Sequence, residues 1–367
     1  MDNTSNTTVN VGFAAIDKEL VTSIPSGVEK EANGKKYLLW GDDNQYPEYL
    51  YGLFTSVSTL KTIIDGTADF AAGNGVKVNI AGFEKEVNKE GLTAFELVRL
   101  LARDWNIYGG FAFQVIRNRA GKVAELYYID FRYLRTDKKK NVFWYSEEYA
   151  KKYARSSKTV VYPKFIPEAT LPASIVYVTN EGSRTYPTPK YSGAIKACEI
   201  ERHIDEYHLS ALENGFGASY IINFLQGIPS DEQKAEIEKN MYEKFAGASN
   251  AGRMMLNFAN GKDNATTVER LDITDFSEKY KAAADRSREQ IFCSFRAVPA
   301  IFGLMTESKG FAEEEFEQAF RLYNRTAVRP IQTLISDTFD KVFGMSGSIT
   351  ISPFSIDDNN NKETAVE

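Results

Sequence analysis

Two long stretches in the second half of the chain place their apolar residues at the period of an α-helix. In the first stretch Ala197, Ile200, Ile204 and Tyr207 follow at steps of three or four residues, with charged residues between them. Asn214-Gly215 then marks the expected end of the helix, because both residue types tolerate a positive φ. The pattern predicts an amphipathic helix with one apolar stripe.

The second stretch has the same character. Its apolar face is formed by Ile273, Phe276, Tyr280, Ala284, Ile291 and Phe295. Each predicted helix has about 24 residues and would span roughly 36 Å at 1.5 Å per residue. The pattern leaves two interpretations open: two antiparallel core helices of an ordinary globular domain, or a rod that carries a module at its tip.

The insert between the two helices, residues 215–272, predicts a small α/β module. Apolar runs predict strands at 220–224, 253–258 and 266–271, and Ser230 is positioned to cap a helix that reaches about residue 245. Because both long helices would emerge from the same place, the ends of the insert are expected to lie close together. A self-contained module of this kind usually binds a partner.

A third helical pattern covers about 312–343 and is followed by a predicted strand at 348–352. Pro330 lies inside this pattern and is expected to kink the helix, since proline removes a backbone donor. The tail, 353–367, has the composition of a disordered segment. Residues 1–35, rich in Thr, Asn and Ser, predict an extended arm.

The first half of the chain mixes both element types. Helices are predicted from Pro47 to about Ala71 and from 95 to 107, and a β-rich block occupies 111–180. Within this block a hairpin is expected to turn at 118–121. Together these patterns predict the α+β class.

Composition changes this picture little. The formal charge of −6 argues against tight, sequence-independent DNA binding, which requires many cations on phosphates. The two cysteines, Cys198 and Cys293, are expected to be buried free thiols in a reducing compartment. The first residues lack the pattern of a signal peptide, and no stretch approaches 18 uninterrupted apolar residues, so neither secretion nor a membrane span is expected.

The search for catalytic or ligand-binding motifs yields weak candidates. The sequence lacks a GxxxxGK[ST] phosphate loop. His203 and His208 are five residues apart, which places them off a common helical face, so no metal site is expected. Ser58-x-x-Lys61 matches an acylation motif of penicillin-recognising enzymes but lacks the partner motifs.

Charged runs have structural interpretations as well. The acidic runs Asp42-Asp43 and Glu313–Glu315 are expected at a turn and at a helix N-terminus, where carboxylates are favoured. The basic run 132–140 could contact nucleic acid, but solvated lysines at a hairpin tip are the preferred interpretation.

Four segments carry a resemblance to a known family. They are YGGFAFQVIRNRAGKVAELYYIDFRYLR (108–135), ENGFGASYII (213–222), AGRMML (251–256) and IFCSFRAVPAIFGL (291–304). In this order they resemble segments of phage portal proteins of the HK97-type family: the hairpin, the junction of stem and clip, a clip strand, and the signature after the second stem helix. The resemblance covers nearly the whole chain.

The resemblance implies a portal fold with an α/β wing, a two-helix stem, a small α/β clip and a long kinked C-terminal helix. The implied parts are an N-terminal arm (1–35), the wing (36–189), two stem helices (190–214 and 273–296), the clip (215–272), a tunnel-loop region (297–311), a kinked helix and strand returning to the wing or to a minimal crown (312–352), and a disordered tail (353–367).

The implied function is mechanical. Portal proteins form a ring, expected here to have twelve subunits, at one capsid vertex of the virion, after assembly in the host cytoplasm. Double-stranded DNA passes through the ring, and the terminase large subunit, a head–tail adaptor and the major capsid protein are the implied partners. No enzymatic activity, cofactor, metal or membrane is implied.

The resemblance also implies two sets of site residues. The DNA-facing tunnel loop would comprise Thr306, Glu307, Ser308, Lys309 and Gly310, with Lys309 as its cation. Partner binding at the clip would involve Ser230, Asp231, Glu232, Lys234 and Arg253. Two alternatives remain: another virion structural protein such as a head–tail adaptor, and an enzyme that uses Ser58 with Lys61 or the paired carboxylates.

Overall fold

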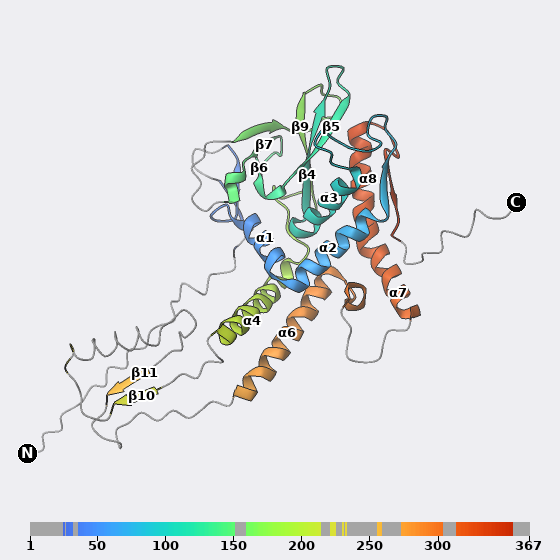
Figure 1. Cartoon of the computed structure of the whole chain (residues 1–367). Helices are drawn as coiled ribbons and strands as arrows, with labels where there is room; N and C mark the ends of the chain where they lie inside the picture. The colour runs from blue at the N-terminus through green and yellow to red at the C-terminus, as the bar shows by residue number, and fades with distance from the viewer. Residues whose placement is uncertain are drawn as a thin grey trace, which may run out of the picture.

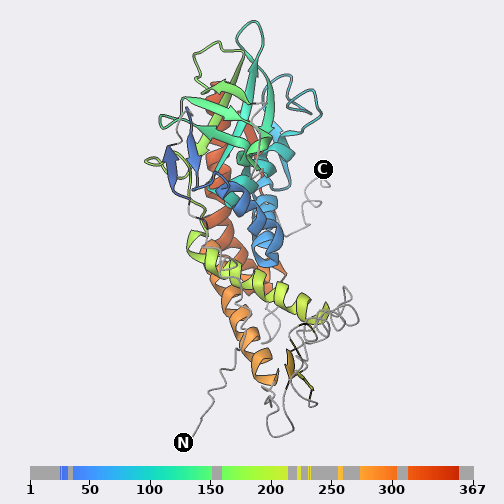
Figure 2. The same ribbon diagram turned by 90° about the vertical axis from the view of Figure 1, so that its left-hand side faces the viewer.

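The larger part of the molecule is a mixed helix-and-sheet body from which two helices extend (Figures 1 and 2). This computed structural model describes residues 25, 27–31, 36–150, 159–213, 221–224, 230, 232, 255–258, 273–303 and 313–354. We use the term main body for the described elements other than the two extended helices and the strand pair at their far end.

The central sheet of the main body is antiparallel and has the order β5-β4-β9. Its strands are β4 (Gly110–Arg117), β5 (Val123–Ile129) and β9 (Ala173–Thr179). The predicted hairpin turn is confirmed: Gly121 has φ +77°, and Asn118 Oδ1 accepts hydrogen bonds from the N–H groups of Ala120 and Lys122 at 2.9 and 3.1 Å. An Asn side chain that binds the backbone ahead of it is a common way to stabilise such a turn.

Smaller sheets surround the central one. The three-stranded sheet β6-β7-β8 contains β6 (Leu134–Thr136), β7 (Val142–Tyr145) and β8 (Val160–Pro163), and two strand pairs join β1 (Glu29–Glu31) to β2 (Leu38–Trp40) and β3 (Gly75–Val78) to β12 (Ile349–Ser352). Strand β1 lies within the segment predicted as an arm and is part of the main body. The short 3-10 turns are η2 (Phe131–Tyr133), η3 (Glu147–Ala150), η4 (Ser192–Ala194) and η6 (Pro299–Phe302).

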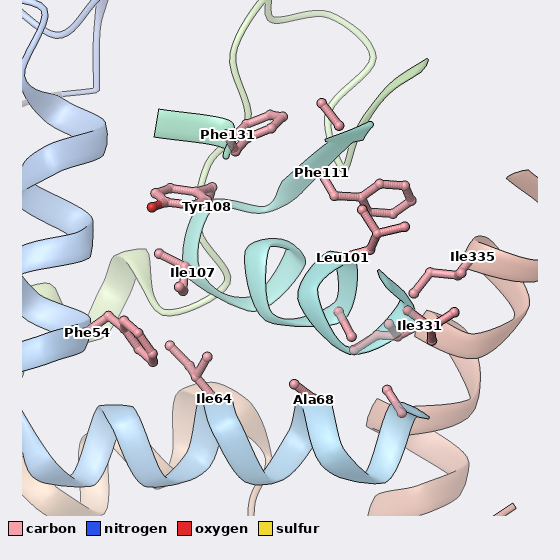
Figure 3. Packing of buried hydrophobic residues seen from close by; sticks show 14 of the residues in the cluster. Phe54, Ile64, Ala68, Leu101, Ile107, Tyr108, Phe111, Phe131, Ile331 and Ile335 are labelled. Carbon is pink, nitrogen blue, oxygen red and sulfur yellow. The ribbon is translucent and has the colours of Figure 1, made fainter. Parts of the chain in front are cut away.

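Helix α3 (Ala94–Tyr108) lies at the centre of the hydrophobic core (Figure 3). Its ends are well defined because Thr93 and Glu96 form a capping box and Gly109 takes φ +83° at the C-cap. Figure 3 shows Leu101 just below Phe111 of β4, with Ile64 and Ala68 of α2 (Ser58–Ala72) on the other side of α3. The preceding helix, α1 (Tyr46–Ser56), begins with a proline in its first turn as expected.

The two extended helices are α4 (Ile195–Glu213) and α6 (Ile273–Phe295), which confirms both helical patterns. They pack against each other and leave the main body together (Figure 1). Beyond their ends, β10 (Ile221–Phe224) pairs in parallel with β11 (Met255–Phe258). In α4, Ala197 and Cys198 are buried, whereas every residue of 205–210 is exposed. The two helices are therefore not enclosed in a core along their length.

The third helical pattern is interrupted by a wider turn. Helix α7 (Glu313–Tyr323) continues into the π-helical turn η7 (Asn324–Val328) and then into α8 (Arg329–Phe343). The expected kink at Pro330 thus takes the form of a π turn just before the proline, in which the N–H of Arg329 reaches the carbonyl of Asn324. Strand β12 then pairs with β3, so the chain returns to the main body.

Two further observations concern expectations from the sequence. Cys293 is exposed on α6, so only Cys198 fits the predicted buried thiol. Within the part of the chain that the structure describes, no helix is both long and apolar enough to cross a membrane.

Candidate functional site

The predicted site residues fall mostly outside the described part of the chain. This applies to all five tunnel-loop residues, Thr306, Glu307, Ser308, Lys309 and Gly310, and to three of the five clip residues, Asp231, Lys234 and Arg253. Ser230 and Glu232 are described and are exposed. The structure does, however, define the elements on which both segments are mounted.

The chain on both sides of residues 304–312 is anchored to one aromatic ring. Phe70, near the C-terminal end of α2, has ring-centroid distances of 6.0 Å to Phe302 before the segment and 5.4 Å to Phe320 after it. Gly66 of the same helix makes room for Phe302, because a Cβ at this glycine would lie 2.8 Å from the phenyl ring. Phe302 before segment 304–312 and Phe320 of α7 after it therefore contact the same side chain.

Aromatic packing also joins the projecting helices to the main body. The ring of Tyr191, just before α4, stacks on that of Phe295 of α6 at 5.6 Å and 22°. Ile291 and Phe292 on α6 are buried as well. Further along the helices the packing becomes sparse, and Tyr207 stacks on Tyr280 at 4.8 Å while remaining half exposed.

A buried carboxylate forms a second joint between α4 and the main body. Glu201 is 7% exposed, and its Oε1 accepts hydrogen bonds from Thr59 Oγ1 (2.8 Å), Ser58 Oγ (3.1 Å) and the Thr59 N–H (3.2 Å). These groups form the first turn of α2, whose N-cap residue, Val57, has no side chain able to cap it. Glu201 thus supplies both the missing acceptor and a negative charge at the positive end of the helix. A further hydrogen bond joins α1 to α4, because Tyr49 Oη donates to Glu199 Oε1 at 2.8 Å.

This arrangement accounts for the Ser58-x-x-Lys61 motif without catalysis. The hydroxyl of Ser58 is directed to Glu201, whereas Lys61 Nζ binds Asp65 Oδ2 at 2.6 Å and lies 4.6 Å from the ring centroid of Phe54. The lysine of the motif is hydrogen-bonded to Asp65 and not to Ser58, so it is not placed to activate the serine hydroxyl. The two side chains instead stabilise the start of α2.

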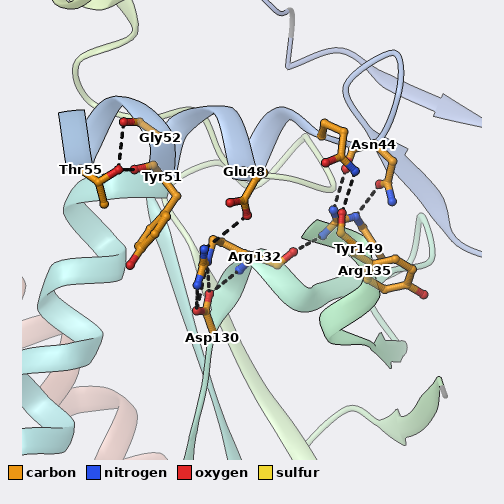
Figure 4. Close-up of polar contacts among 10 residues, drawn as sticks. Asn44, Glu48, Tyr51, Gly52, Thr55, Asp130, Arg132, Arg135 and Tyr149 are labelled. Carbon is orange, nitrogen blue, oxygen red and sulfur yellow. Dashed lines mark hydrogen bonds and ion pairs between the residues drawn. The ribbon is translucent and has the colours of Figure 1, made fainter. Parts of the chain in front are cut away.

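The basic run 132–140 is not a solvated cationic tip throughout. Arg132 is held by Asp130 at 2.8 Å and by Glu48 at 3.3 Å, and its guanidinium lies over the ring of Tyr51 (Figure 4). Arg135 is 1% exposed and donates to the Asn44 carbonyl at 2.9 Å. The preferred interpretation holds only for the exposed lysines of the run, since both arginines are structural.

Among the described residues, the other titratable groups make contacts within the fold. Asp104 is fully buried and accepts a hydrogen bond from Tyr128 Oη at 2.9 Å, and burial raises the pKa of this carboxyl well above its usual range. Among the described residues no group of His, Cys, Asp and Glu is arranged to hold a metal, and His203 simply lies 3.0 Å from Glu206 on the exposed side of α4. A surface hollow lined by charged residues of 82–89 is open to solvent and lies apart from Ser58.

The comparison with protein families decides the identity. The model of the phage portal protein family matches residues 83–357, which is most of the chain. The chain belongs to the phage portal protein family. The predicted resemblance is thereby confirmed, and the family is one of structural virion proteins.

Solved structures share the portal chain's fold at low sequence identity. A chain from the neck of a native gene transfer agent (GTA) particle, computed with C12 symmetry, is 18% identical with a TM-score of 0.53, and 85% of each chain is covered. A chain from the neck of the empty GTA particle, computed with C6 symmetry, is 17% identical with a TM-score of 0.53, covering 86% of the portal chain and 85% of its own. No curated protein matches the sequence.

Sequence reasoning missed two residues that fix the geometry of the portal chain, Glu201 and Phe70. Glu201 is one of several acidic residues on its helix, and nothing in the sequence indicates that this one is buried. Its partners, Thr59 and Ser58, are 142 and 143 positions away. Phe70 belongs to an apolar helix end like many others. A signal is present only in the neighbouring glycine, since Gly66 in the middle of a helix implies close approach by another group.

Proposed function

We propose that this portal-family chain assembles into a closed ring of twelve copies at one capsid vertex, with double-stranded DNA passing through its bore. The family match over 83–357 carries the proposal, because it spans both projecting helices and the module between them. In the proposal residues 190–214 and 273–296, which contain α4 and α6, are the stem, 215–272 the clip and 36–189 the wing. Residues 312–352 return to the wing or to a minimal crown. The C12 and C6 symmetries of the GTA necks fit a ring of this size.

The proposed partners follow from the same assignment. The clip, with Ser230, Asp231, Glu232, Lys234 and Arg253, would bind the terminase large subunit during packaging and a head–tail adaptor afterwards. The wing would contact the major capsid protein.

The proposed tunnel loop is the segment with a shared base at Phe70. The residues Phe302 and Phe320 on either side of this segment both contact Phe70, and in the proposal the loop Thr306–Gly310 extends into the bore with Lys309 near the DNA. Twelve copies at −6 would carry −72, so the rest of the assembly would repel phosphate rather than retain it.

Negative-stain electron microscopy with mass photometry tests the ring. The chain has a mass of 41.3 kDa, so twelve copies give a particle of about 500 kDa with a central hole. A monodisperse monomer that turns over a substrate would instead indicate an enzyme. A ring without a projecting stem and clip would indicate an adaptor. Deleting Thr306–Gly310 should leave assembly intact and impair packaging, and unimpaired packaging would reject the role of the loop.

A further inference from the structure

The C-terminal rod, formed by α7, η7 and α8, has an unusual distribution of charge on its outer side. Residues 318–336 contain three arginines, Arg321, Arg325 and Arg329, and no Asp, Glu or Lys, in a chain whose net charge is −6. All three arginines are exposed. Arg321 binds Glu317 at 2.9 Å, whereas Arg325 and Arg329 form no ion pair with any described residue.

The π turn aligns these side chains. In a regular α-helix a step of four residues overshoots a full turn by about 40°, so two steps would rotate the third arginine about 80° from the first. The slower winding of η7, which lies between Arg321 and Arg329, offsets this rotation. The three arginines therefore form a row in which successive residues are about 6 Å apart along the helix axis. Every second phosphate of one DNA strand is separated by a similar rise, two steps of about 3.4 Å each along the DNA axis.

The opposite face of the rod fixes the direction of the row. Tyr323, Val328 and Ile331 are buried, and the hydroxyl groups of Tyr323 and Thr67 are hydrogen-bonded at 2.6 Å. Figure 1 shows α7 and α8 along the edge of the main body opposite β6 and β7. The rod cannot rotate its arginines inward without exposing this core.

We propose that Arg321, Arg325 and Arg329 form a strip that contacts the phosphates of double-stranded DNA. The inference rests on the proposed function, because α7 begins directly after segment 304–312 and the strip would be the next set of cations beyond the tunnel loop. A guanidinium group stays charged at any physiological pH and binds phosphate oxygens in pairs. On an otherwise acidic assembly, this strip would hold DNA where the surrounding surface repels it.

A neighbouring subunit is the competing occupant of this surface. Leu322, beside the strip, is 62% exposed, and an apolar side chain of this size would suit a protein contact. The absence of acids among residues 318–336 favours a polyanion, since a subunit contact on a mixed surface would tolerate both signs of charge. The test therefore follows both DNA binding and assembly.

The experiment uses assembled wild-type rings and the double variant R325Q/R329Q, which leaves the Arg321–Glu317 pair intact. Binding of a fluorescent 30-base-pair duplex is followed by anisotropy across a series of salt concentrations. Loss of two phosphate contacts should reduce the slope of log K against log salt by about 1.8 for each subunit that contacts the duplex, which corresponds to up to about 60-fold weaker binding per contacting subunit at 0.1 M salt. The variant R119Q/K122Q at the β4–β5 turn removes the same charge from exposed positions and should bind like the wild type.

Three outcomes would overturn the strip. The first is equal DNA binding by wild-type and R325Q/R329Q rings. The second is an equal loss in R119Q/K122Q, which would show a general charge effect. The third is that R325Q/R329Q and L322Q break the ring, while any rings that remain bind DNA normally, which would identify a subunit interface. If the wild-type chain forms no ring at all, the proposed function fails, and this result is distinct from all three.

Discussion

Replacing Glu201 by alanine should loosen the first turn of α2 and the joint between this helix and α4. One oxygen of Glu201 accepts from two groups of Thr59 and from the hydroxyl of Ser58, and the site is buried. The substitution removes this acceptor without exposing the donors to water. It therefore leaves a buried N–H and a buried hydroxyl unsatisfied at a helix end that has no other cap.

The magnitude follows from these contacts. Loss of an N-cap acceptor costs about 0.5–2 kcal/mol, and a buried donor left without a partner costs about 1–3 kcal/mol. The desolvation of the carboxylate in the native state offsets part of this sum. A net cost of about 2–3 kcal/mol is expected for Glu201→Ala. Glu201→Gln keeps one carbonyl acceptor but loses the charge at the helix end, so about 1 kcal/mol is expected.

Hydrogen exchange of the Thr59 amide is the most direct assay, because a chain of this size is not expected to unfold in two states. Among the described residues the Thr59 amide donates to Glu201, so a loss of about 2 kcal/mol should accelerate its exchange about 30-fold. Glu206→Ala is the matched control on the exposed side of α4 and should change exchange at Thr59 by less than twofold. Equal exchange rates in Glu201→Ala and in this control would refute the capping role.

Three further predictions concern the main body. Asp104→Asn should raise the melting temperature at pH 7.5 and flatten its dependence on pH. Burial raises the pKa of Asp104, so the stabilising contribution of this carboxyl is present below about pH 3.9 and is lost as pH rises. The Tyr128 hydroxyl keeps an acceptor in the variant, because the asparagine side chain has a carbonyl oxygen. Asp340→Asn should have the opposite dependence on pH. Hydrogen bonds from the turn after α8 lower the pKa of Asp340, so the stabilising contribution of this carboxylate is lost as pH falls below about 3.9. Between pH 7 and pH 3 the melting temperature should therefore decrease less in the variant than in the wild type. Phe70→Ala should cost about 2–3 kcal/mol, measured as faster hydrogen exchange of the α2 amides, and Phe95→Ala, at an exposed position, less than about 1 kcal/mol. Similar values for both variants would contradict the anchoring role.

Hydrophobic periodicity predicted where most of the described helices lie, although the pattern from Pro47 to about Ala71 divides at Val57 into α1 and α2. Both helical patterns correspond to observed helices. The first stripe is only partly buried, because Ala197 and Ile204 are buried whereas Ile200 and Tyr207 are 45% and 49% exposed. The hairpin turn at 118–121 was also predictable, since Asn and Gly are required there by local backbone geometry. Local rules thus recover the elements that depend on local interactions.

Features that depend on distant partners could not be predicted in this way. Arg135 belongs to a basic run, yet its burial is possible because its guanidinium donates hydrogen bonds to the backbone carbonyls of Asn44, Arg132 and Leu134. The π turn was assigned only as a kink at Pro330, although the apolar pattern contains a step of five from Tyr323 to Val328 that indicates an extra residue. Glu201 shows the same limit, because its role depends on donors contributed by another helix.

Helix α2 connects the features that the proposed function requires. Its first turn is bound by Glu201 of one projecting helix, and its last turns carry Phe70, whose ring contacts Phe302 before segment 304–312 and Phe320 after it. Between them, Thr67 binds Tyr323 of the C-terminal rod. The helix has 15 residues and thus a length of about 22 Å, and its core face is packed throughout, so it behaves as a rigid spacer. The projecting helices, the proposed tunnel loop and the arginine strip are therefore positioned relative to one rigid element, and a substitution that weakens α2 should affect all three, whereas a substitution on the loop should affect the loop alone.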